Sequence, residues 1–401
     1  MNKHWITIIG INQEDITTLN KLALKALSES EIIFGAKRHI KQFKDLKKKC
    51  FIWPKPFENI IKNLKKNRGR KHVLLVSGNA FWYGLGALVA REFSRNEWQC
   101  FQAPSSFSLA TAEMGWSIES VLCLGLHAKR NEVLRPFMAP GVKFILLLKE
   151  GKSVRSLTNF FTKEGFGDSE FTILESLGYK EFRKREIVAK NNQVNNVNHP
   201  VCVAIITKGS GFIIPKSSGK PDNLFLNDGQ LTKQYIRSVT LSALAPMPYE
   251  HLWDLGAGSG SVSIEWLLSD KTTTATAVEI NKKRIKLITK NCEMLGIERL
   301  KILNEDINKI VRKLKTKPHA VFFGGGVNED LFKKIWNLIP INTRIVVNSV
   351  TIETESCITK LYNIYGGTLL KLELSNIKKI GKSHAWSSNY PIVQWKVIKL
   401  K

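Results

Sequence analysis

Three glycines, Gly256, Gly258 and Gly260, form a Gly-x-Gly-x-Gly turn directly after the apolar run "HLWDL". Glycine lets the backbone turn sharply after a strand, and the amides of such a turn, with the N-terminus of the next helix, bind polar ligands. Asp254 precedes the turn, where a carboxylate accepts a hydrogen bond from a loop amide or binds a ligand ammonium. Glu279 ends the next apolar run, about twenty residues further on, where an acidic side chain accepts hydrogen bonds from ribose hydroxyls. The pattern predicts a site for a nucleoside.

A third carboxylate, Asp306, ends the run "LKILNED" and is placed to recognise the edge of an adenine. The turn lacks the Gly-x-Gly-x-x-Gly spacing of pyrophosphate binders, and no arginine beside Glu279 indicates a 2′-phosphate. Two alternatives stay open at this point. One is a tight turn that binds nothing, and the other is a dinucleotide fold with a nicotinamide cofactor.

The order of these features resembles the class I S-adenosylmethionine methyltransferases, whose cofactor carries no phosphate. Members that methylate amino groups of bases often have an Asn-Pro-Pro-Tyr clamp after the fourth strand, where this chain has Gly324, Gly325 and Gly326. These glycines predict a floor with room for a broad, flat substrate, and a plain strand-to-helix turn is the equal alternative. Thr232 is expected at or near the N-cap of a helix, with its hydroxyl and Lys233 able to reach over the cofactor mouth.

The first half of the chain carries another glycine loop, "VSGNAFWYGLG" from Val76 to Gly86. Together with "ITIIGI", "IIFGAKRHI" and "QAPSSFSLATAEMGW", it resembles the tetrapyrrole methylase family, whose members bind S-adenosylmethionine between two α/β lobes. Asn79 and Ala80 stand where that family has an aspartate and a proline, so an acceptor oxygen is kept and a charge is lost. The family's Gly-Ile-Gly pattern near the N-terminus has become Gly10-Ile11-Asn12.

Both signatures in this order resemble the fused methyltransferases that build the corrin ring, over almost the whole chain. The resemblance implies that the first domain methylates C5 of a precorrin-6 macrocycle, and that the second methylates C15 and removes carbon dioxide from the ring C acetate. It implies one S-adenosyl-L-methionine per domain, a polycarboxylate tetrapyrrole substrate and a homo-oligomer, and it leaves open whether the substrate holds cobalt. The cofactor-binding residues it implies are Gly78, Asn79, Ala80, Ser105, Ser106, Thr232, Asp254, Gly256, Ala257, Gly258, Ser259, Gly260, Glu279, Asp306 and Ile307.

Methyl transfer from a sulfonium requires alignment and exclusion of water, but no obligatory nucleophile or metal. The sequence has no metal-ligand cluster and no Ser/His/Asp or Cys/His signature, and we name no catalytic base. His39, Tyr235 and His384 could move protons, although a structural role is the expected one. Substrate contacts are expected from Arg38, Lys233, Arg237, Gly324, Gly325 and Gly326, with Lys382 a further cation.

The net charge of +27 is the largest anomaly of the composition. A positive field of this size attracts polyanions such as RNA or a polycarboxylate. However, the basic residues are dispersed without aromatic interleaving, which favours a composition bias or an acidic small substrate over nucleic acid. Six cysteines without a CxxC pair indicate a reducing compartment, and no apolar stretch is long enough for a bilayer, so we expect a cytoplasmic protein without a membrane partner.

Short β-branched runs alternate with amphipathic stretches such as 18–26 and 282–295, which predicts an α/β fold with mostly parallel sheets. The expected domains are 1–214, with two α/β lobes, and 222–401, which is Rossmann-like, joined by a linker at 215–221. The strand-like runs are "WITIIGI", "EIIFGA", "HVLLVSG", "KFILLLK", "CVAIIT", "HLWDLG", "TATAVEI", "LKILNED", "AVFFGG" and "RIVVNSV".

Overall fold

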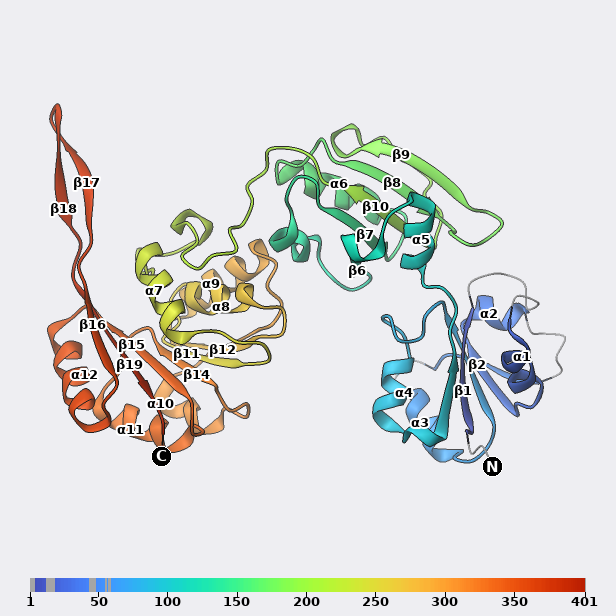
Figure 1. Ribbon diagram of the computed structural model, residues 1–401, viewed down its shortest axis with the longest axis horizontal. Helices are drawn as coiled ribbons and strands as arrows, with labels where there is room; N and C mark the ends of the chain where they lie inside the picture. The colour runs from blue at the N-terminus through green and yellow to red at the C-terminus, as the bar shows by residue number, and fades with distance from the viewer. Residues whose placement is uncertain (1–3, 12–18, 43–47, 55, 57–58, 401) are drawn as a thin grey trace. The chain divides into compact units, whose positions relative to one another are not determined.

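The computed structural model describes residues 4–11, 19–42, 48–54, 56 and 59–400 (Figure 1). The chain divides into two compact units, Met1–Asn131 with Ala139–Phe212 and Glu132–Met138 with Ile213–Lys401. Residues 215–221, the expected linker, therefore lie inside the second unit. Both units are α/β, as the sequence predicts.

A parallel five-stranded sheet begins the first unit (Figure 1). Its strands and helices are β1 Ile6–Ile11, α1 Lys21–Ser28, β2 Ile32–Gly35, α2 Lys37–Gln42, β3 Lys49–Ile52, α3 Asn59–Lys66, β4 His72–Ser77, α4 Gly86–Glu92 and β5 Trp98–Phe101. The strand order is β3-β2-β4-β1-β5, and β1 and β4 are almost fully buried, as central parallel strands covered on both faces are. Because parallel strands end on the same side, the C-terminal ends of β1, β2 and β4 lie at one edge of the sheet.

A mixed sheet of order β6-β7-β10-β8-β9 completes the first unit. The bounds are α5 Ser106–Met114, β6 Val121–Gly125, β7 Lys143–Leu148, α6 Ser153–Lys163, β8 Glu170–Glu175, β9 Arg183–Val188 and β10 Val201–Ile206. β6 and β7 are parallel, whereas β10 is antiparallel to β7. The segment that enters β10 thus lies at the same end of the sheet as the segments that leave β6 and β7.

A seven-stranded sheet with the order β13-β12-β11-β14-β15-β19-β16 forms the second unit. The bounds are α7 Gln234–Leu244, β11 His251–Leu255, α8 Ser261–Ser269, β12 Thr274–Glu279, α9 Lys282–Met294, β13 Leu300–Asn304, α10 Ile307–Ile310, β14 Ala320–Phe323, α11 Glu329–Leu338, β15 Arg344–Ser349, α12 Ile352–Tyr365, β16 Thr368–Leu372, β17 Ser375–Ile380, β18 Ser383–Ser388 and β19 Ile392–Ile398. The strands β11, β12, β13, β14 and β15 are parallel, and β19 is antiparallel to both of its neighbours, β15 and β16. The strands β17 and β18 form a separate projecting hairpin (Figure 1).

Helices cover both faces of this sheet. Successive side chains of a strand point to opposite faces, so that one strand contacts helices on both sides. Leu252 of β11 belongs to a buried cluster with residues of α7, α8 and α9. The next residue, Trp253, belongs to a second cluster with residues of α11 and α12. The second unit is therefore a three-layer structure, and its glycine turn lies at the end of a fully buried strand.

Short 3-10 helices connect several of these elements: η3 Arg95–Glu97, η4 Ile118–Ser120, η5 Asn131–Phe137, η6 Ala189–Asn191, η7 Asp222–Leu224 and η8 Val311–Lys313. All ten runs predicted as strands are strands. The amphipathic stretch 282–295 is helix α9. The stretch 18–26 overlaps helix α1, which begins at Lys21, and Thr18 lies outside the described residues. No helix in the described parts of the chain is long and apolar enough to cross a membrane.

Candidate functional site

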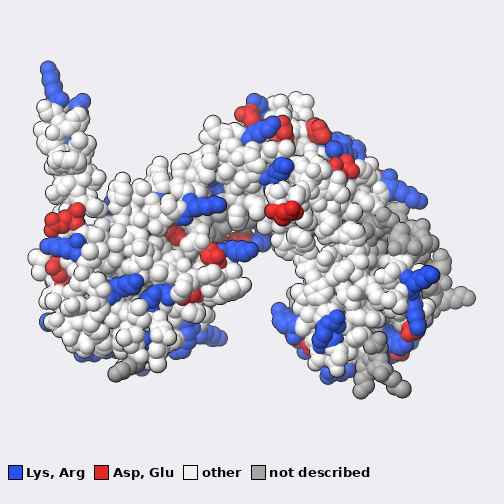
Figure 2. Space-filling view, in the orientation of Figure 1, with Lys and Arg blue, Asp and Glu red and all other residues white. Residues whose placement is uncertain are grey.

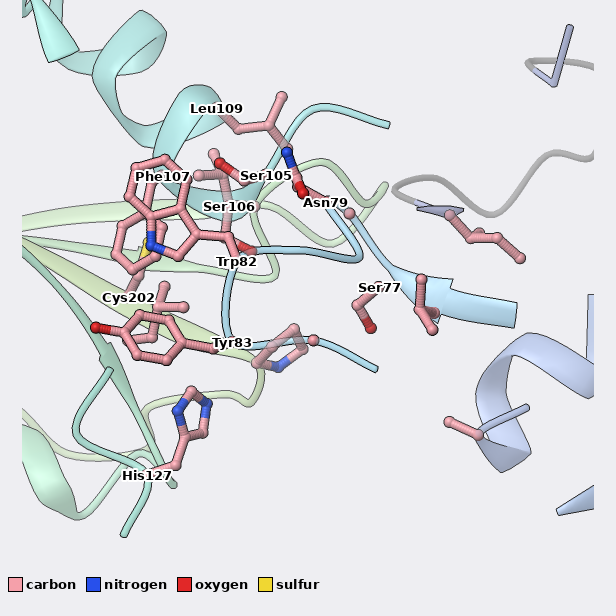
Figure 3. Close-up of a pocket in the computed structure, with 18 of the residues that line it drawn as sticks. Ser77, Asn79, Trp82, Tyr83, Ser105, Ser106, Phe107, Leu109, His127 and Cys202 are labelled. Carbon is pink, nitrogen blue, oxygen red and sulfur yellow. The ribbon is translucent and has the colours of Figure 1, made fainter. Parts of the chain in front are cut away.

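A cavity of about 480 Å³ lies at the edge of the first unit where β1, β2 and β4 end (Figure 3). Its size is within the range of about 300–1,000 Å³ that is usual for small-molecule sites. Five of the residues predicted for the first site line it: Arg38, Gly78, Asn79, Ser105 and Ser106. The fold thus brings together segments that are far apart in the sequence.

The glycine loop after β4 follows a tight local path. Gly78 has a φ of 57°, and the Cβ that an L-residue would add at Gly10 would lie 2.1 Å from the Gly78 carbonyl oxygen. Asn79 Oδ1 accepts a hydrogen bond from the Phe81 amide at 2.8 Å, so the asparagine shapes the loop. Ala80 is fully buried behind the loop, where its amide donates to Gln102 Oε1 at 2.9 Å. Ala80 is therefore part of the support of the loop and does not line the cavity.

Ser105 and Ser106 lie at the beginning of α5 and have different environments. Ser105 is the N-cap of the helix, is 6% exposed, and accepts a hydrogen bond from the Ser108 amide at 3.0 Å. Ser106 is exposed and lines the cavity, as Figure 3 shows. Capping accounts for Ser105 by itself, whereas the hydroxyl of Ser106 is available to a ligand.

Aromatic and histidine side chains that we did not predict also line this cavity. Trp82 lies against Phe107 with ring centroids 4.9 Å apart, and Tyr83 is 62% exposed in a left-handed conformation (Figure 3). His127 and His199 come from the segments after β6 and before β10. The run of three aromatic residues inside a glycine loop was a usable signal for Trp82 and Tyr83, but neither histidine has a local sequence pattern.

His39 has a structural role, as the sequence analysis expected. It is 1% exposed, and its ring nitrogens contact the Leu75 carbonyl at 3.2 Å and Ser77 Oγ at 3.3 Å. Burial, helped by the neighbouring Arg38 charge, lowers its pKa to about 4. The imidazole is therefore neutral at pH 7 and is held by protein partners.

The glycine turn of the second unit has the geometry expected of a ligand loop. Gly256, Gly258 and Gly260 all have positive φ values, of 77°, 58° and 77°. The Gly256 and Ala257 amides donate to the Val278 carbonyl, at 2.9 and 3.1 Å, and Gly260 is the N-cap of α8. Only glycine adopts three such conformations in five residues without strain.

Two buried carboxylates flank this turn. Glu279 is 4% exposed; its Oε2 accepts a hydrogen bond from the Gly258 amide at 2.8 Å and its Oε1 from the Asn281 amide at 2.9 Å. Asp254 is fully buried and accepts from the Ser263 amide and hydroxyl through Oδ2, while its Oδ1 has no partner among the described residues. Burial raises the pKa of Asp254 to about 6, and the Glu279 charge adds to the increase. A buried acceptor without a partner among the described residues, beside a glycine turn, fits a ligand ammonium.

The segment before α7 lies beside the same turn. Asn291 of α9 donates from Nδ2 to the carbonyls of Leu226 and Ser259, each at 2.9 Å, which ties the two segments together. Arg284 donates to Asp228 at 2.8 Å and to Gln230 at 2.7 Å. The arrangement brings Thr232, which is half-buried, to the same region. The N-cap of α7 is Lys233 with no side-chain capping bond, so Thr232 precedes the cap.

Arg237 is not a substrate residue, which corrects our prediction. It is fully buried and donates to Glu265 at 2.6 Å and to Asp222 at 3.1 Å, and it also donates to the carbonyls of Thr232 and Lys220. Its guanidinium also lies over the Phe225 ring, 4.6 Å from the centroid. Every nitrogen of the guanidinium is used inside the protein, because a buried charge requires such partners. The exposed Lys233 is not constrained in this way.

The glycines after β14 divide into two kinds. A Cβ at Gly324 would lie 2.3 Å from the Gly256 carbonyl oxygen, so a glycine is needed there for close approach to the turn. Gly325 and Gly326 have open space where a side chain would be, as a flat substrate floor requires. Asp306 is the N-cap of α10 and accepts from the Asn308 amide at 2.8 Å, and Ile307 is the first residue of that helix. In the described residues no group of three or more His, Cys, Asp or Glu side chains could hold a metal ion.

Comparison with known proteins identifies two methyltransferase modules in the chain. Residues 6–190 match the family model of tetrapyrrole (corrin/porphyrin) methylases, and residues 223–399 match that of the precorrin methyltransferase domain. The class defined by the fold and both glycine turns is therefore a fused pair of methyltransferases.

The full-length relatives define the family more narrowly. A protein of Sinorhizobium sp. named precorrin-6Y C(5,15)-methyltransferase [decarboxylating] is 32% identical over 98% of this chain and 95% of its own. A Mycobacterium tuberculosis protein of the same name is 29% identical over 98% of this chain and all of its own. The crystal structure of the C-terminal domain of a Rhodobacter capsulatus precorrin-6Y C5,15-methyltransferase is 37% identical and covers 46% of this chain and 100% of that one, with a TM-score of 0.45. The chain belongs to the precorrin-6Y C5,15-methyltransferase (decarboxylating) family.

Proposed function

We propose that this chain methylates C5 and C15 of a precorrin-6 macrocycle in cobalamin biosynthesis and removes carbon dioxide from the ring C acetate. The first unit transfers the C5 methyl group, and the second carries out C15 methylation and decarboxylation. The observation that carries the proposal is a full-length similarity to enzymes named for both methylations, in a chain with one glycine loop in each unit. The cytoplasmic location and the homo-oligomer remain predictions.

Each unit binds one S-adenosyl-L-methionine in this proposal. In the second unit Asp254 holds the ammonium, Glu279 the ribose hydroxyls and Asp306 the adenine edge, and the unpartnered Asp254 Oδ1 supports this assignment. In the first unit the loop at Gly78 and Asn79, with Ser106, faces the cofactor. The cofactor supplies an activated methyl group, so the protein has to orient the two reactants and exclude water.

Decarboxylation needs an electron sink, and the conjugated imine of the macrocycle serves as one. The bond between the acetate methylene and its carboxylate breaks, and the electron pair passes through the ring to C15. That carbon then takes up the methyl group at the same site. The open floor at Gly325 and Gly326 supports binding of a broad ring there.

The test is incubation of the full chain with reduced precorrin-6 and labelled S-adenosylmethionine, followed by mass analysis. The expected product has gained two methyl groups and lost one carbon dioxide. Calorimetry with S-adenosylhomocysteine is expected to find two sites per chain, one of which disappears in Glu279→Ala. The matched control is Glu305→Ala, an exposed carboxylate near the same sheet edge. A single binding site in the wild-type chain would refute the assignment of one cofactor to each unit.

A polyanion such as RNA is the alternative substrate that the charge leaves open. Lysine and arginine side chains are scattered over the visible face, with other residues between them (Figure 2). This dispersion does not favour a nucleic-acid groove. RNA binding with a steep salt dependence, in the absence of S-adenosylhomocysteine binding, would support the alternative.

A further inference from the structure

A group of cationic and ionisable side chains lines the cavity of the first unit away from the glycine loop. Arg38, His127 and His199 are all exposed there. Among the described residues that line the cavity there is no aspartate or glutamate. None of the three is needed to shape the glycine loop, so their common position requires another explanation.

Three different elements bring these side chains together. Arg38 lies in α2, just after β2, and its Nη2 donates to Ser77 Oγ at 2.7 Å. His127 follows β6, and the position of a Cβ at Gly125 would be 3.5 Å from its Nδ1 and 3.6 Å from the Tyr83 ring. Figure 3 shows the Tyr83 and His127 side chains beside one another. His199 directly precedes Pro200 and β10, at the end of the sheet where β6 finishes.

The loop that carries His199 is fastened by a buried carboxylate. Glu175 is fully buried and accepts a hydrogen bond from the Asn198 amide at 2.7 Å. It also forms ion pairs with Arg183 at 2.6 Å and Arg185 at 2.7 Å, and those arginines donate to backbone carbonyls in the same loop. At Gly151 a Cβ would lie 2.1 Å from the Val197 carbonyl oxygen. The position of His199 is therefore set by several contacts.

The charges of these groups oppose one another. Loss of water contact lowers the pKa of His199, and the Arg38 charge lowers it further, with only Glu150 acting in the other direction. Loss of water contact also lowers the pKa of His127, to which His199 adds. The other titratable groups among the described residues that line the cavity are Tyr83, Tyr179 and the buried His39 and Cys202. An anion at this place would relieve the repulsion and favour protonation of both imidazoles.

We propose that Arg38, His127 and His199 form a carboxylate subsite that binds one acidic side chain of the macrocycle during C5 methylation, with proton uptake by the histidines. The inference rests on the proposed function. Arg38 supplies a permanent charge and two donors in a fork that fits a carboxylate, and the histidines add charge only when the anion is present. The cofactor also carries a carboxylate, and the experiment must separate the two sources.

The test compares the wild-type chain with His199→Gln and His127→Gln/His199→Gln, using reduced precorrin-6 and S-adenosylmethionine. Mass analysis separates C5 methylation from C15 methylation with loss of carbon dioxide. In the double variant the KM for the macrocycle in C5 methylation is expected to rise by about ten- to a hundredfold, because charge-assisted hydrogen bonds are lost. The KM for S-adenosylmethionine and the decarboxylation are expected to stay within about twofold of the wild-type values. The control Lys163→Gln, at an exposed residue of α6 that does not line the cavity, should leave all these values unchanged within the same limit.

Proton uptake supplies an independent readout. Wild-type affinity for the macrocycle at the first site is expected to fall as pH rises from about 5.5 to 7.5, since the imidazoles lose the proton that pairs with the anion. The double variant should lose this dependence, and His127→Gln/His199→Lys should regain affinity relative to the double variant without regaining the dependence. The S-adenosylhomocysteine complex is titrated with the macrocycle in a calorimeter, in two buffers of different ionisation enthalpy. The difference in heat measures the number of protons taken up when the macrocycle binds.

Two results would overturn the inference. One is an unchanged KM for the macrocycle in the double variant, and the other is weaker S-adenosylhomocysteine binding instead, which would assign the three side chains to the cofactor. Absence of C5 methylation by the wild-type chain is a different failure, because it overturns the proposed function and this inference with it.

Discussion

Asp254 is the residue whose environment departs most from that of an ordinary carboxyl group in the second unit. Among the described residues only Ser263 donates hydrogen bonds to it, both to Oδ2, and burial raises its pKa to about 6. The pKa of this carboxyl group is higher in the folded chain than in the unfolded chain. The free energy of unfolding is therefore largest at pH values below the pKa of the unfolded chain. That stability is lost as pH rises toward 6, when the buried group must ionise.

Replacing the acid by the neutral Asp254→Asn tests this reasoning. From pH 4 to 7 the stability of the variant relative to wild type is expected to increase by up to about 3 kcal/mol, since the wild type alone pays for a buried charge. Urea unfolding followed by the fluorescence of the buried Trp253 and Trp266 measures it. The variant should also bind S-adenosylhomocysteine at least about tenfold more weakly, because the ammonium loses its charged partner. Parallel pH profiles for the variant and wild type would contradict the assignment.

Arg237 shows how a plausible substrate residue becomes a structural one. We expected this basic residue to contact the substrate, but its side chain points into the protein toward Glu265. Glu265 also accepts hydrogen bonds from the Gly219 and Lys220 amides, at 2.7 and 2.8 Å. Buried ion pairs of Glu265 with Arg237 and Lys220 therefore hold α7 and the segment at Lys220 against α8.

Arg237→Met is accordingly expected to destabilise the second unit by about 3–5 kcal/mol, because the buried Glu265 would lose its nearer cation and keep the more distant Lys220 ammonium, at 3.9 Å. At temperatures where the variant stays folded, its KM for the macrocycle should equal the wild-type value. Lys233→Met, at an exposed neighbouring position, is the control and should change stability by less than about 0.5 kcal/mol. A raised KM in a fully folded Arg237→Met chain would restore the substrate role.

At the scale of elements, the glycine turn after β11 and the glycine segment after β14 depend on each other. The Gly324 amide donates to the Leu255 carbonyl at 2.9 Å, which continues the pairing of the two strands into the loops. The absence of a side chain at Gly324 lets the segment approach the Gly256 carbonyl oxygen. Close contact between these two loops shapes one wall of the second site.

Gly324→Ala is expected to weaken S-adenosylhomocysteine binding and to destabilise the unit by about 1–3 kcal/mol, because the added methyl group forces the loops apart. Gly325→Ala is a matched control one residue away, where the added methyl group meets open space. Calorimetry and thermal unfolding of both variants give the comparison. Equal behaviour of the two alanine variants would show that close approach is not what requires the glycine.

For the whole molecule, the excess of 61 basic over 34 acidic residues is the feature whose use is still to be tested. If the positive field attracts the polycarboxylate substrate, added salt should weaken binding of this substrate, because screening shortens the range of the attraction. Raising ionic strength from about 0.05 to 0.5 M is expected to increase the KM for the macrocycle several-fold and to leave that for S-adenosylmethionine within about twofold. A KM for the macrocycle that does not change with salt would leave composition bias as the explanation.

Much of the fold could be predicted from local patterns. The ten predicted strands are apolar runs long enough to be buried, and burial is a property that such runs carry in their own composition. Among the strands that we did not predict, β8 and β19 are apolar and mostly buried, and we missed them. Others are short, such as β3, or exposed and rich in polar residues, such as β17 and β18. Their pairing is decided by neighbours in space, for which the local sequence has no signal.

The sequence by itself determined the two glycine loops, because a sharp turn after a buried strand requires glycine whatever surrounds it. It also placed acidic side chains at the ends of neighbouring parallel strands, where the chain direction alone brings them together. Only the tertiary structure decided that Arg237 is buried and that His127 and His199 share a cavity with Arg38. The physical reason is that charge and burial depend on which distant elements meet. For example, β7 pairs with both β6 and β10, which brings His127 and His199 to the same end of one sheet.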